Sequence, residues 1–165
     1  FGVIYGISGF GLARNLRIPR SEAQGFIDRY FERFPGIRTY MDDTKAFAKE
    51  HGYVQTLFGR RIHTPEIASK GPRAGFAARA AINAPIQGTA ADVIRRAMIR
   101  MPDAIADLPA KMLLQVHDEL VVEVAPGEAE LVSDLIRAAM SGAVELAVPL
   151  DVSIGIGSSW QAAAH

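Results

Sequence analysis

Apolar residues recur with helical spacing through the N-terminal part of the chain. One run occupies i, i+3, i+4, i+7, i+8 and i+11, namely Ala23, Phe26, Ile27, Tyr30, Phe31 and Phe34. The spacing repeats in Ile37, Tyr40, Met41, Thr44, Phe47 and Ala48, and Pro35-Gly36 separates the two runs. This pattern predicts a helical hairpin. Ser8 predicts the start of a shorter helix through about Leu16, and Ser21 with Gln24 predicts a capping box.

The middle of the chain combines strand and helix signals. Tyr53–Leu57 and Arg60–Thr64 flank Phe58-Gly59 and predict a small β-hairpin, followed by a loop over residues 65–72. Helices are expected over 73–82 and from about Gln87 to Met101. Asn83-Ala84-Pro85 is expected to interrupt them, because proline breaks the helical hydrogen-bond pattern.

The C-terminal part is richer in β-strand signals. Lys111–Val116 and Leu120–Val124 are β-rich runs, and apolar residues from Leu131 to Val144 predict another helix. Leu150–Ile156 alternates apolar and polar residues and predicts a half-buried strand. Helices followed by an antiparallel sheet with packed helices predict an α+β fold.

Charge is divided unevenly along the 165 residues. The 18 Lys/Arg balance the 18 Asp/Glu overall, but residues 1–100 hold 16 basic and 8 acidic residues, a balance of +8. Residues 101–165 hold 2 basic and 10 acidic residues, a balance of −8. This asymmetry indicates a polyanionic partner on one side and cation chemistry on the other.

Composition excludes several classes of protein. A content of 49% hydrophobic and 22% charged residues is typical of a globular domain. No run approaches the roughly 18–20 apolar residues of a membrane span. The absence of cysteine excludes disulfides and thiolate metal sites and fits a reducing cytoplasm. A start at Phe1, within an apolar glycine-rich run, suggests a piece of a longer protein.

Two adjacent carboxylates follow a histidine between two apolar strands. The segment is Gln115-Val116-His117-Asp118-Glu119-Leu120-Val121-Val122-Glu123. Adjacent carboxylates repel each other, and a bound divalent cation such as Mg²⁺ or Mn²⁺ relieves that repulsion. The alternative is a solvated hairpin turn, since Asp is common in turns.

Two further segments are candidates for recognition. Asn83 and Gln87 are uncharged bidentate hydrogen-bonding residues at the start of an expected helix, although Asn83 and Thr89 could be caps and Gln87 merely exposed. Phe1 and Tyr5 would share one face of a helix, as i and i+4 residues do. Two such aromatic residues belong to a core more often than to a stacking surface.

Three segments together resemble the DNA polymerase I family, the family A DNA polymerases. Phe1-Gly2-Val3-Ile4-Tyr5-Gly6 resembles the end of motif B, and Gln115–Leu120 resembles motif C. The run from Asn83 to Asp92 resembles the family segment that opens a long palm helix. The three are colinear with the family, and the similarity extends to Trp160. The resemblance implies a partial fingers subdomain over 1–72 and a partial palm subdomain over 73–165.

The resemblance also implies a role for each matching residue. Asp118 would be the catalytic ligand of Mg²⁺ with Glu119 as a weaker contributor, and His117 would lie near the primer terminus. Phe1 would pack against the sugar and base of the incoming nucleotide, and Tyr5 would lie at the insertion site near the templating base. Arg79, Asn83 and Gln87 would contact the minor groove of primer–template DNA. Such donors suit a site that must not read sequence, because every base pair offers minor-groove acceptors.

The implied activity is template-directed transfer of dNMP from dNTP to a primer 3′-hydroxyl with two metal ions, in DNA replication and repair. The expected location is the cytoplasm, at the bacterial nucleoid. Motif A, the upstream part of motif B, the thumb and most of the fingers are absent, so the isolated chain is expected to be inactive. Self-association through exposed subdomain interfaces is also expected.

Two other functions remain open. One is a metal-dependent nuclease or phosphatase built on Asp118, Glu119 and His117, for which Asp92, Asp151 and Glu123 are the remaining candidate ligands. The other is a non-catalytic DNA-binding module whose basic half binds the phosphate backbone.

Overall fold

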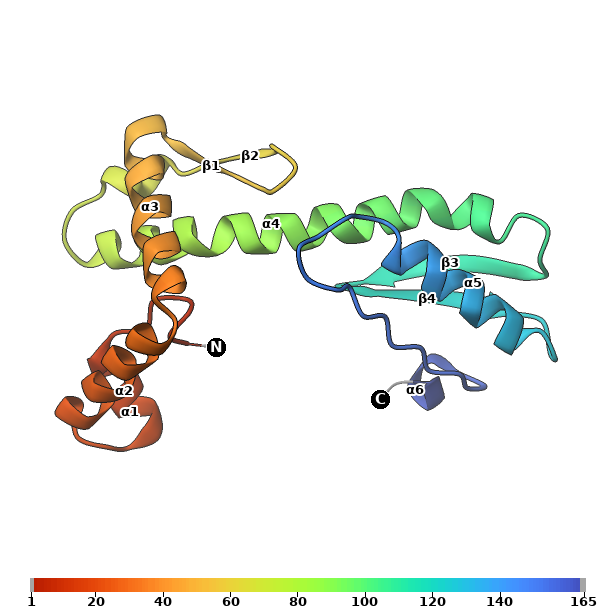
Figure 1. Cartoon of the computed structure of the whole chain (residues 1–165), viewed down its shortest axis with the longest axis horizontal. Helices are drawn as coiled ribbons and strands as arrows, with labels where there is room; N and C mark the ends of the chain where they lie inside the picture. Colours follow the sequence, from red (N-terminus) through yellow and green to blue (C-terminus); the bar gives the residue numbers. More distant parts are fainter. Residues whose placement is uncertain (1, 164–165) are drawn as a thin grey trace. The chain divides into compact units, whose positions relative to one another are not determined.

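Helices and two small antiparallel sheets make up the chain, which confirms the α+β class (Figure 1). The computed structural model describes residues 2–163. They form two compact units, one ending at Thr89 and the other beginning at Ala90.

The first unit begins with three helices, α1 (Gly9–Leu16), α2 (Arg20–Arg33) and α3 (Pro35–His51). Ser8 caps α1 as predicted, because its hydroxyl accepts a 3.1 Å hydrogen bond from the Gly11 amide. Only Phe34 separates α2 from α3, and α1 packs against α2 (Figure 1). The helices predicted on either side of Pro35-Gly36 are therefore present.

The predicted capping box at Ser21 is wrong. Pro19 is the N-cap residue of α2, and its carbonyl accepts the first helical hydrogen bond, 3.0 Å from the Ala23 amide. The ring of Pro19 favours the extended backbone that an N-cap adopts. Helix α2 therefore begins before Ser21, and the Gln24 side chain donates to Asp28 instead, at 2.9 Å.

A hairpin of two short strands follows, β1 (Tyr53–Gln55) and β2 (Arg61–His63). They pair antiparallel, as predicted, and each strand is shorter than expected; Val54 lies opposite Ile62. A 3-10 helix, η1 (Pro65–Ala68), occupies part of the predicted loop. Ala48, Val54 and Ala81 form the buried core of this unit, with Ile62, Ile67 and Ala84 packed against them.

Helix α4 runs without interruption from Pro72 to Ala104, so the predicted break at residues 83–85 is wrong (Figure 1). Pro85 lacks the N–H that would bond to the carbonyl of Ala81, a loss that ordinarily costs about 3 kcal/mol within a helix. Tertiary contacts offset that cost: Ala81 and Ile82 are buried, and the Tyr40 hydroxyl donates to the Ile82 carbonyl at 2.7 Å. Long as α4 is, no helix in the described chain is apolar enough over a sufficient length to cross a membrane.

The second unit packs a hairpin against helices. Strands β3 (Ala110–Val116) and β4 (Glu119–Val124) pair antiparallel and are followed by α5 (Ala129–Ser141), as predicted. Met101 and Val132 are almost completely buried at the centre of its core, at 0% and 1% exposure. A short helix, α6 (Trp160–Ala163), ends the described chain.

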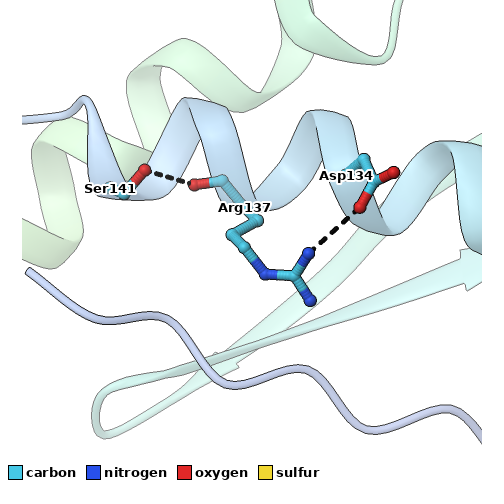
Figure 2. Close-up of polar contacts among 3 residues, drawn as sticks. All are labelled: Asp134, Arg137 and Ser141. Atoms are coloured by element: carbon cyan, nitrogen blue, oxygen red, sulfur yellow. Dashed lines mark hydrogen bonds and ion pairs between the residues drawn. The ribbon is translucent and has the colours of Figure 1, made fainter.

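The exposed side of α5 satisfies its own polar groups. Arg137 donates to Asp134 at 3.0 Å, and the Ser141 hydroxyl donates to the Arg137 carbonyl at 2.7 Å (Figure 2). The Asp134–Arg137 pair, at i and i+3 on a helix surface, is worth about 0.2–0.5 kcal/mol. Val132 and Ile136 of the same helix are buried in the core of this unit.

The strand predicted over Leu150–Ile156 is wrong, because these residues belong to no sheet in the described chain. The alternating pattern has a different cause here: Ile154 packs against the core around Met101 and Val132, while Asp151 and Ser153 are exposed. Ile156 of the same pattern is 59% exposed, so the segment packs Ile154 on the core without a neighbouring strand to complete a ladder.

The Tyr40 hydrogen bond predicts a pH-dependent stability of the first unit. Burial raises the pKa of Tyr40, although a hydrogen bond with Thr44 partly opposes the shift. Because the folded pKa is raised, this stabilisation is complete below the ordinary tyrosine pKa of about 10 and is lost as the pH rises through the folded value. Tyr40→Phe should cost about 1 kcal/mol at neutral pH. Urea denaturation from pH 7 to 11 measures both effects. If the free energy of unfolding of Tyr40→Phe fell at alkaline pH as much as that of the unmodified chain, the account of Tyr40 would be contradicted.

Candidate nucleic-acid interface and carboxylate turn

Three of the predicted DNA-binding residues form one row on α4. Arg79, Asn83 and Gln87 are four residues apart, so the helix places them on the same face. Arg79 and Gln87 are exposed, whereas Asn83 is half-buried. We call these three residues the α4 polar row. It presents a guanidinium and two amides, which are hydrogen-bond donors spaced at regular intervals along the helix.

Asn83 has an unusual environment within this row. Its Oδ1 atom is buried and has no hydrogen-bond partner in the described part of the chain. An unsatisfied buried acceptor costs free energy of about 1–3 kcal/mol. Proteins retain few such atoms. Because the minor groove offers mainly acceptors, the part of Asn83 that would bind it is the side-chain NH2 group and not Oδ1. The structure thus singles out Asn83 among the row residues.

Tyr5 lies in a tight turn that rests on α4 beside Arg79. The amides of Gly6 and Ile7 donate to the carbonyls of Val3 and Gly2 at 3.0 and 2.9 Å, and Gly6 has a left-handed φ of 77°. This double hydrogen bond is the Schellman pattern. A Cβ atom on Gly6 would lie 3.3 Å from Cγ of Arg79, so the turn touches the α4 polar row.

Tyr5 does not lie on a helix, so the helical face that it was expected to share with Phe1 is not present. Residues 2–6 form turns and no helix, and Phe1 lies outside the described residues. Tyr5 is half-buried. The structure therefore places the turn that carries Tyr5 against Arg79, through Gly6, while the predicted role of Phe1 stays a prediction.

The second candidate site is the turn that joins β3 to β4. Val116 pairs with Glu119, which leaves His117 and Asp118 as a two-residue turn. His117 has a positive φ of 53°. Residues other than glycine adopt this backbone conformation at a cost in free energy, and such residues recur at functional sites. The Gln115 side chain donates to the His117 carbonyl and supports this backbone. We call residues 117–119 the carboxylate turn.

The sheet determines where the acidic side chains of this turn lie. Leu120 packs against the core, so its strand neighbour Glu119 lies on the opposite face of the sheet. His117, Asp118 and Glu119 are all exposed. Two adjacent carboxylates are thus presented to solvent at the end of a hairpin.

The donor set of the carboxylate turn fits Mg²⁺ only in part. Within residues 2–163 no group of three or more His, Asp or Glu side chains converges as metal ligands do. Asp92, Asp151 and Glu123 therefore do not join Asp118 and Glu119 in such a group. Mg²⁺ commonly keeps several waters and takes only one or two protein carboxylates besides substrate phosphates. Asp118 and Glu119 could hold it in that manner.

The two candidate sites belong to units of opposite charge. The unit ending at Thr89 carries 13 Lys/Arg and 7 Asp/Glu, a balance of +6, and includes the α4 polar row. The unit from Ala90 onward carries 5 and 11, a balance of −6, and includes the carboxylate turn. A positive surface favours phosphates, and a negative one favours cations.

Sequence reasoning missed the residues that attach the β1–β2 hairpin to α4. Thr89 was considered as a helix cap, yet it lies within α4 and its hydroxyl accepts a 3.0 Å hydrogen bond from the Leu57 amide. Arg60 donates to the Gly88 carbonyl at 2.8 Å. The threonine and glycine in the helix, opposite an arginine in the hairpin, are a weak signal, because each residue type has many other uses.

Comparison with known proteins agrees with this arrangement. Residues 1–162 match the model of DNA polymerase family A. The chain is 53% identical to DNA polymerase I of Pseudomonas aeruginosa and 52% identical to that of Rhizobium leguminosarum, each over 99% of the chain. These matches cover 18% and 17% of the two relatives, so the chain spans about a fifth of their length.

A solved structure shares the fold. It is the POL domain of Pol1 from M. smegmatis in complex with DNA primer-template and dNTP. The match has a TM-score of 0.93 at 48% identity and covers 99% of this chain and 30% of the other. With a family match that extends over almost its whole length, this chain belongs to DNA polymerase family A.

Proposed function

We propose that this chain forms part of a DNA-directed DNA polymerase that transfers dNMP from dNTP to a primer 3′-hydroxyl in replication and repair. The observation that carries the proposal is the α4 polar row, a regular line of donors in a chain of DNA polymerase family A. The relative from M. smegmatis, whose structure holds primer-template and dNTP, supports the choice of partners. The nucleoid is the corresponding location.

The α4 polar row acts on duplex DNA. Arg79, Asn83 and Gln87 donate to minor-groove acceptors, which are present at every base pair whatever its sequence. Such contacts test the shape of a base pair without reading its identity. Tyr5, resting beside Arg79, lies at the insertion site, and Phe1 packs against the incoming nucleotide.

The carboxylate turn acts on the reacting phosphate. Asp118 is the principal metal ligand, Glu119 assists it, and His117 lies near the primer terminus. Two divalent ions, once bound, supply the charge that stabilises the attacking and leaving oxygens. The exposure of both carboxylates leaves room for the waters and phosphates that Mg²⁺ retains.

Within that polymerase, residues 1–72 form part of the fingers subdomain and residues 73–165 form part of the palm subdomain. Two metal ions need more carboxylates than this one turn supplies, and no third ligand joins Asp118 and Glu119 in the described part of the chain. The 165 residues alone are therefore inactive in polymerisation, whereas the α4 polar row needs no metal ion to bind DNA.

A segment exchange tests the polymerase role. The chain replaces the matching segment of the Pseudomonas aeruginosa relative, to which it is 53% identical. We expect the chimera to extend a primer, Asp118→Asn to slow extension by at least about a hundredfold, and DNA affinity to stay nearly unchanged. Primer-extension gels and fluorescence anisotropy measure the two quantities.

Asp107→Asn, also exposed and outside the proposed site, is the matched control and should extend normally. The 165-residue chain alone should incorporate no nucleotide under the same conditions. Extension by the Asp118→Asn chimera at the control rate, or by the chain alone, would overturn the assignment.

The open face of the β3–β4 sheet supports a second expectation, self-association of the isolated chain. Leu113 and Leu114 are 50% and 46% exposed, and both strands are sheet edges within the described chain. Exposed apolar edges pair with other chains. Leu114→Lys should shift the chain toward monomer in analytical ultracentrifugation, whereas Leu16→Lys, at an equally exposed leucine of the first unit, should not. A monomeric unmodified chain at tens of micromolar would refute this.

A further inference from the structure

The tip of the β1–β2 hairpin is attached to α4 immediately beside Gln87. The Arg60 guanidinium donates to the Gly88 carbonyl at 2.8 Å, and the Leu57 amide donates to the Thr89 hydroxyl at 3.0 Å. Both acceptors follow Gln87 directly in the helix. The hairpin therefore fixes the part of α4 that carries the last residue of the α4 polar row.

The attachment is closely packed and internally braced. A Cβ atom on Gly88 would lie 2.7 Å from Cδ1 of Ile62 and 2.8 Å from Cγ2 of Thr56, so only glycine permits this approach. Thr56 is buried, and its hydroxyl accepts hydrogen bonds from the amides of Phe58 and Arg60 at 3.3 and 3.2 Å. These bonds hold the tip in the shape that directs Arg60 toward the helix.

The polar row crosses a weak point of its helix. Arg79 and Asn83 precede Pro85, and Gln87 follows it. Because Pro85 donates no hydrogen bond, helices bend most readily at such a residue. Bending at Pro85 would move Gln87 out of line with Arg79 and Asn83. The hairpin tip is attached at Gly88 and Thr89, three and four residues beyond the proline, where it can oppose that bending.

We propose that Arg60 is a positioning residue, which keeps Gln87 aligned with Arg79 and Asn83 across Pro85 while duplex DNA is bound. The inference rests on the proposed function of the α4 polar row. Arg60 itself acts through the Gly88 carbonyl.

Arg61 provides a matched control for the test. It is the next residue and carries the same charge, but its guanidinium lies over the Tyr53 ring, 4.6 Å from the centroid. Arg60→Met and Arg61→Met are compared in the 165-residue chain, each with Gln87 and with Gln87→Ala. Gly88→Ala displaces the tip without changing charge. Fluorescence anisotropy with a primer–template duplex measures affinity.

We expect Arg60→Met and Gly88→Ala to weaken binding about five- to tenfold when Gln87 is present and less than about twofold in the Gln87→Ala background. Arg61→Met should have the same small effect in both backgrounds, as a loss of bulk charge does. Equal losses for Arg60→Met and Arg61→Met, or losses independent of Gln87, would overturn the proposal.

Amide hydrogen exchange separates this inference from the proposed function, because it needs no DNA. Arg60→Met should speed exchange of residues 86–89 about tenfold, leaving β3 and β4 unchanged, whereas Arg61→Met should leave residues 86–89 protected. If no variant binds DNA, the proposed function fails and exchange alone decides whether the hairpin holds the helix. Unchanged exchange in Arg60→Met would overturn the positioning role.

Discussion

Pro85 cannot donate a hydrogen bond to the Ala81 carbonyl, and yet α4 continues through it from Pro72 to Ala104. The helix is supported from outside at this point. Tyr40 donates to the carbonyl of Ile82 on one side of the proline, and the hairpin contacts Gly88 and Thr89 on the other. Much of the first unit, namely α3, the hairpin and the buried Ala81, is thus arranged around one interrupted hydrogen-bond ladder.

A helix supported in this way can present side chains at fixed intervals. A flexible segment would lose conformational entropy whenever it aligned three donors with DNA, at roughly 1–2 kcal/mol for each backbone residue ordered. In α4 that cost is met during folding, by packing of Ala81 and Ile82 and by the external hydrogen bonds. The row of Arg79, Asn83 and Gln87 is therefore preorganised, which favours binding.

The side chains of the carboxylate turn are also held in place by the surrounding structure. A two-residue turn puts His117 in a left-handed conformation, which costs free energy, and the Gln115 side chain helps to support it. Alternate packing of Leu120 and Val122 against the core fixes the register of β4, and so fixes the face on which Glu119 lies. The exposed carboxylates are consequently held by the buried side of the sheet.

Sequence patterns predicted those elements whose cause is local. Ser8 caps α1 because its hydroxyl reaches an amide three residues on. The apolar runs of α2, α3 and α5 contain the residues that these helices bury, although Phe26, Phe34 and Phe47 of the same runs are exposed. The motifs of the family resemblance also identified the family correctly. These successes depend on contacts between residues close in sequence, or on similarity over the whole chain.

The capping box at Ser21 failed for a local reason, because Pro19 two residues before it is the N-cap of α2. The other errors arose where distant residues decide the outcome. Nothing near Pro85 in the sequence indicates that Tyr40 and Arg60 would support a continuous helix there. The alternation of Leu150–Ile156 likewise gives no sign that Ile154 would pack on a core without strand pairing. The contact of Thr89 with Leu57 joins residues 32 positions apart and has no local signature.

The preorganised row can be observed directly by NMR, because Asn and Gln side chains give separate amide signals. A primer–template duplex is titrated into the isotopically labelled chain, and the side-chain amides of Asn83 and Gln87 are followed with those of Asn15 and Gln55. We predict that the Asn83 and Gln87 signals shift together and saturate at one DNA concentration, while those of Asn15 and Gln55 move little. DNA binding that leaves Asn83 and Gln87 unshifted would contradict the role assigned to α4.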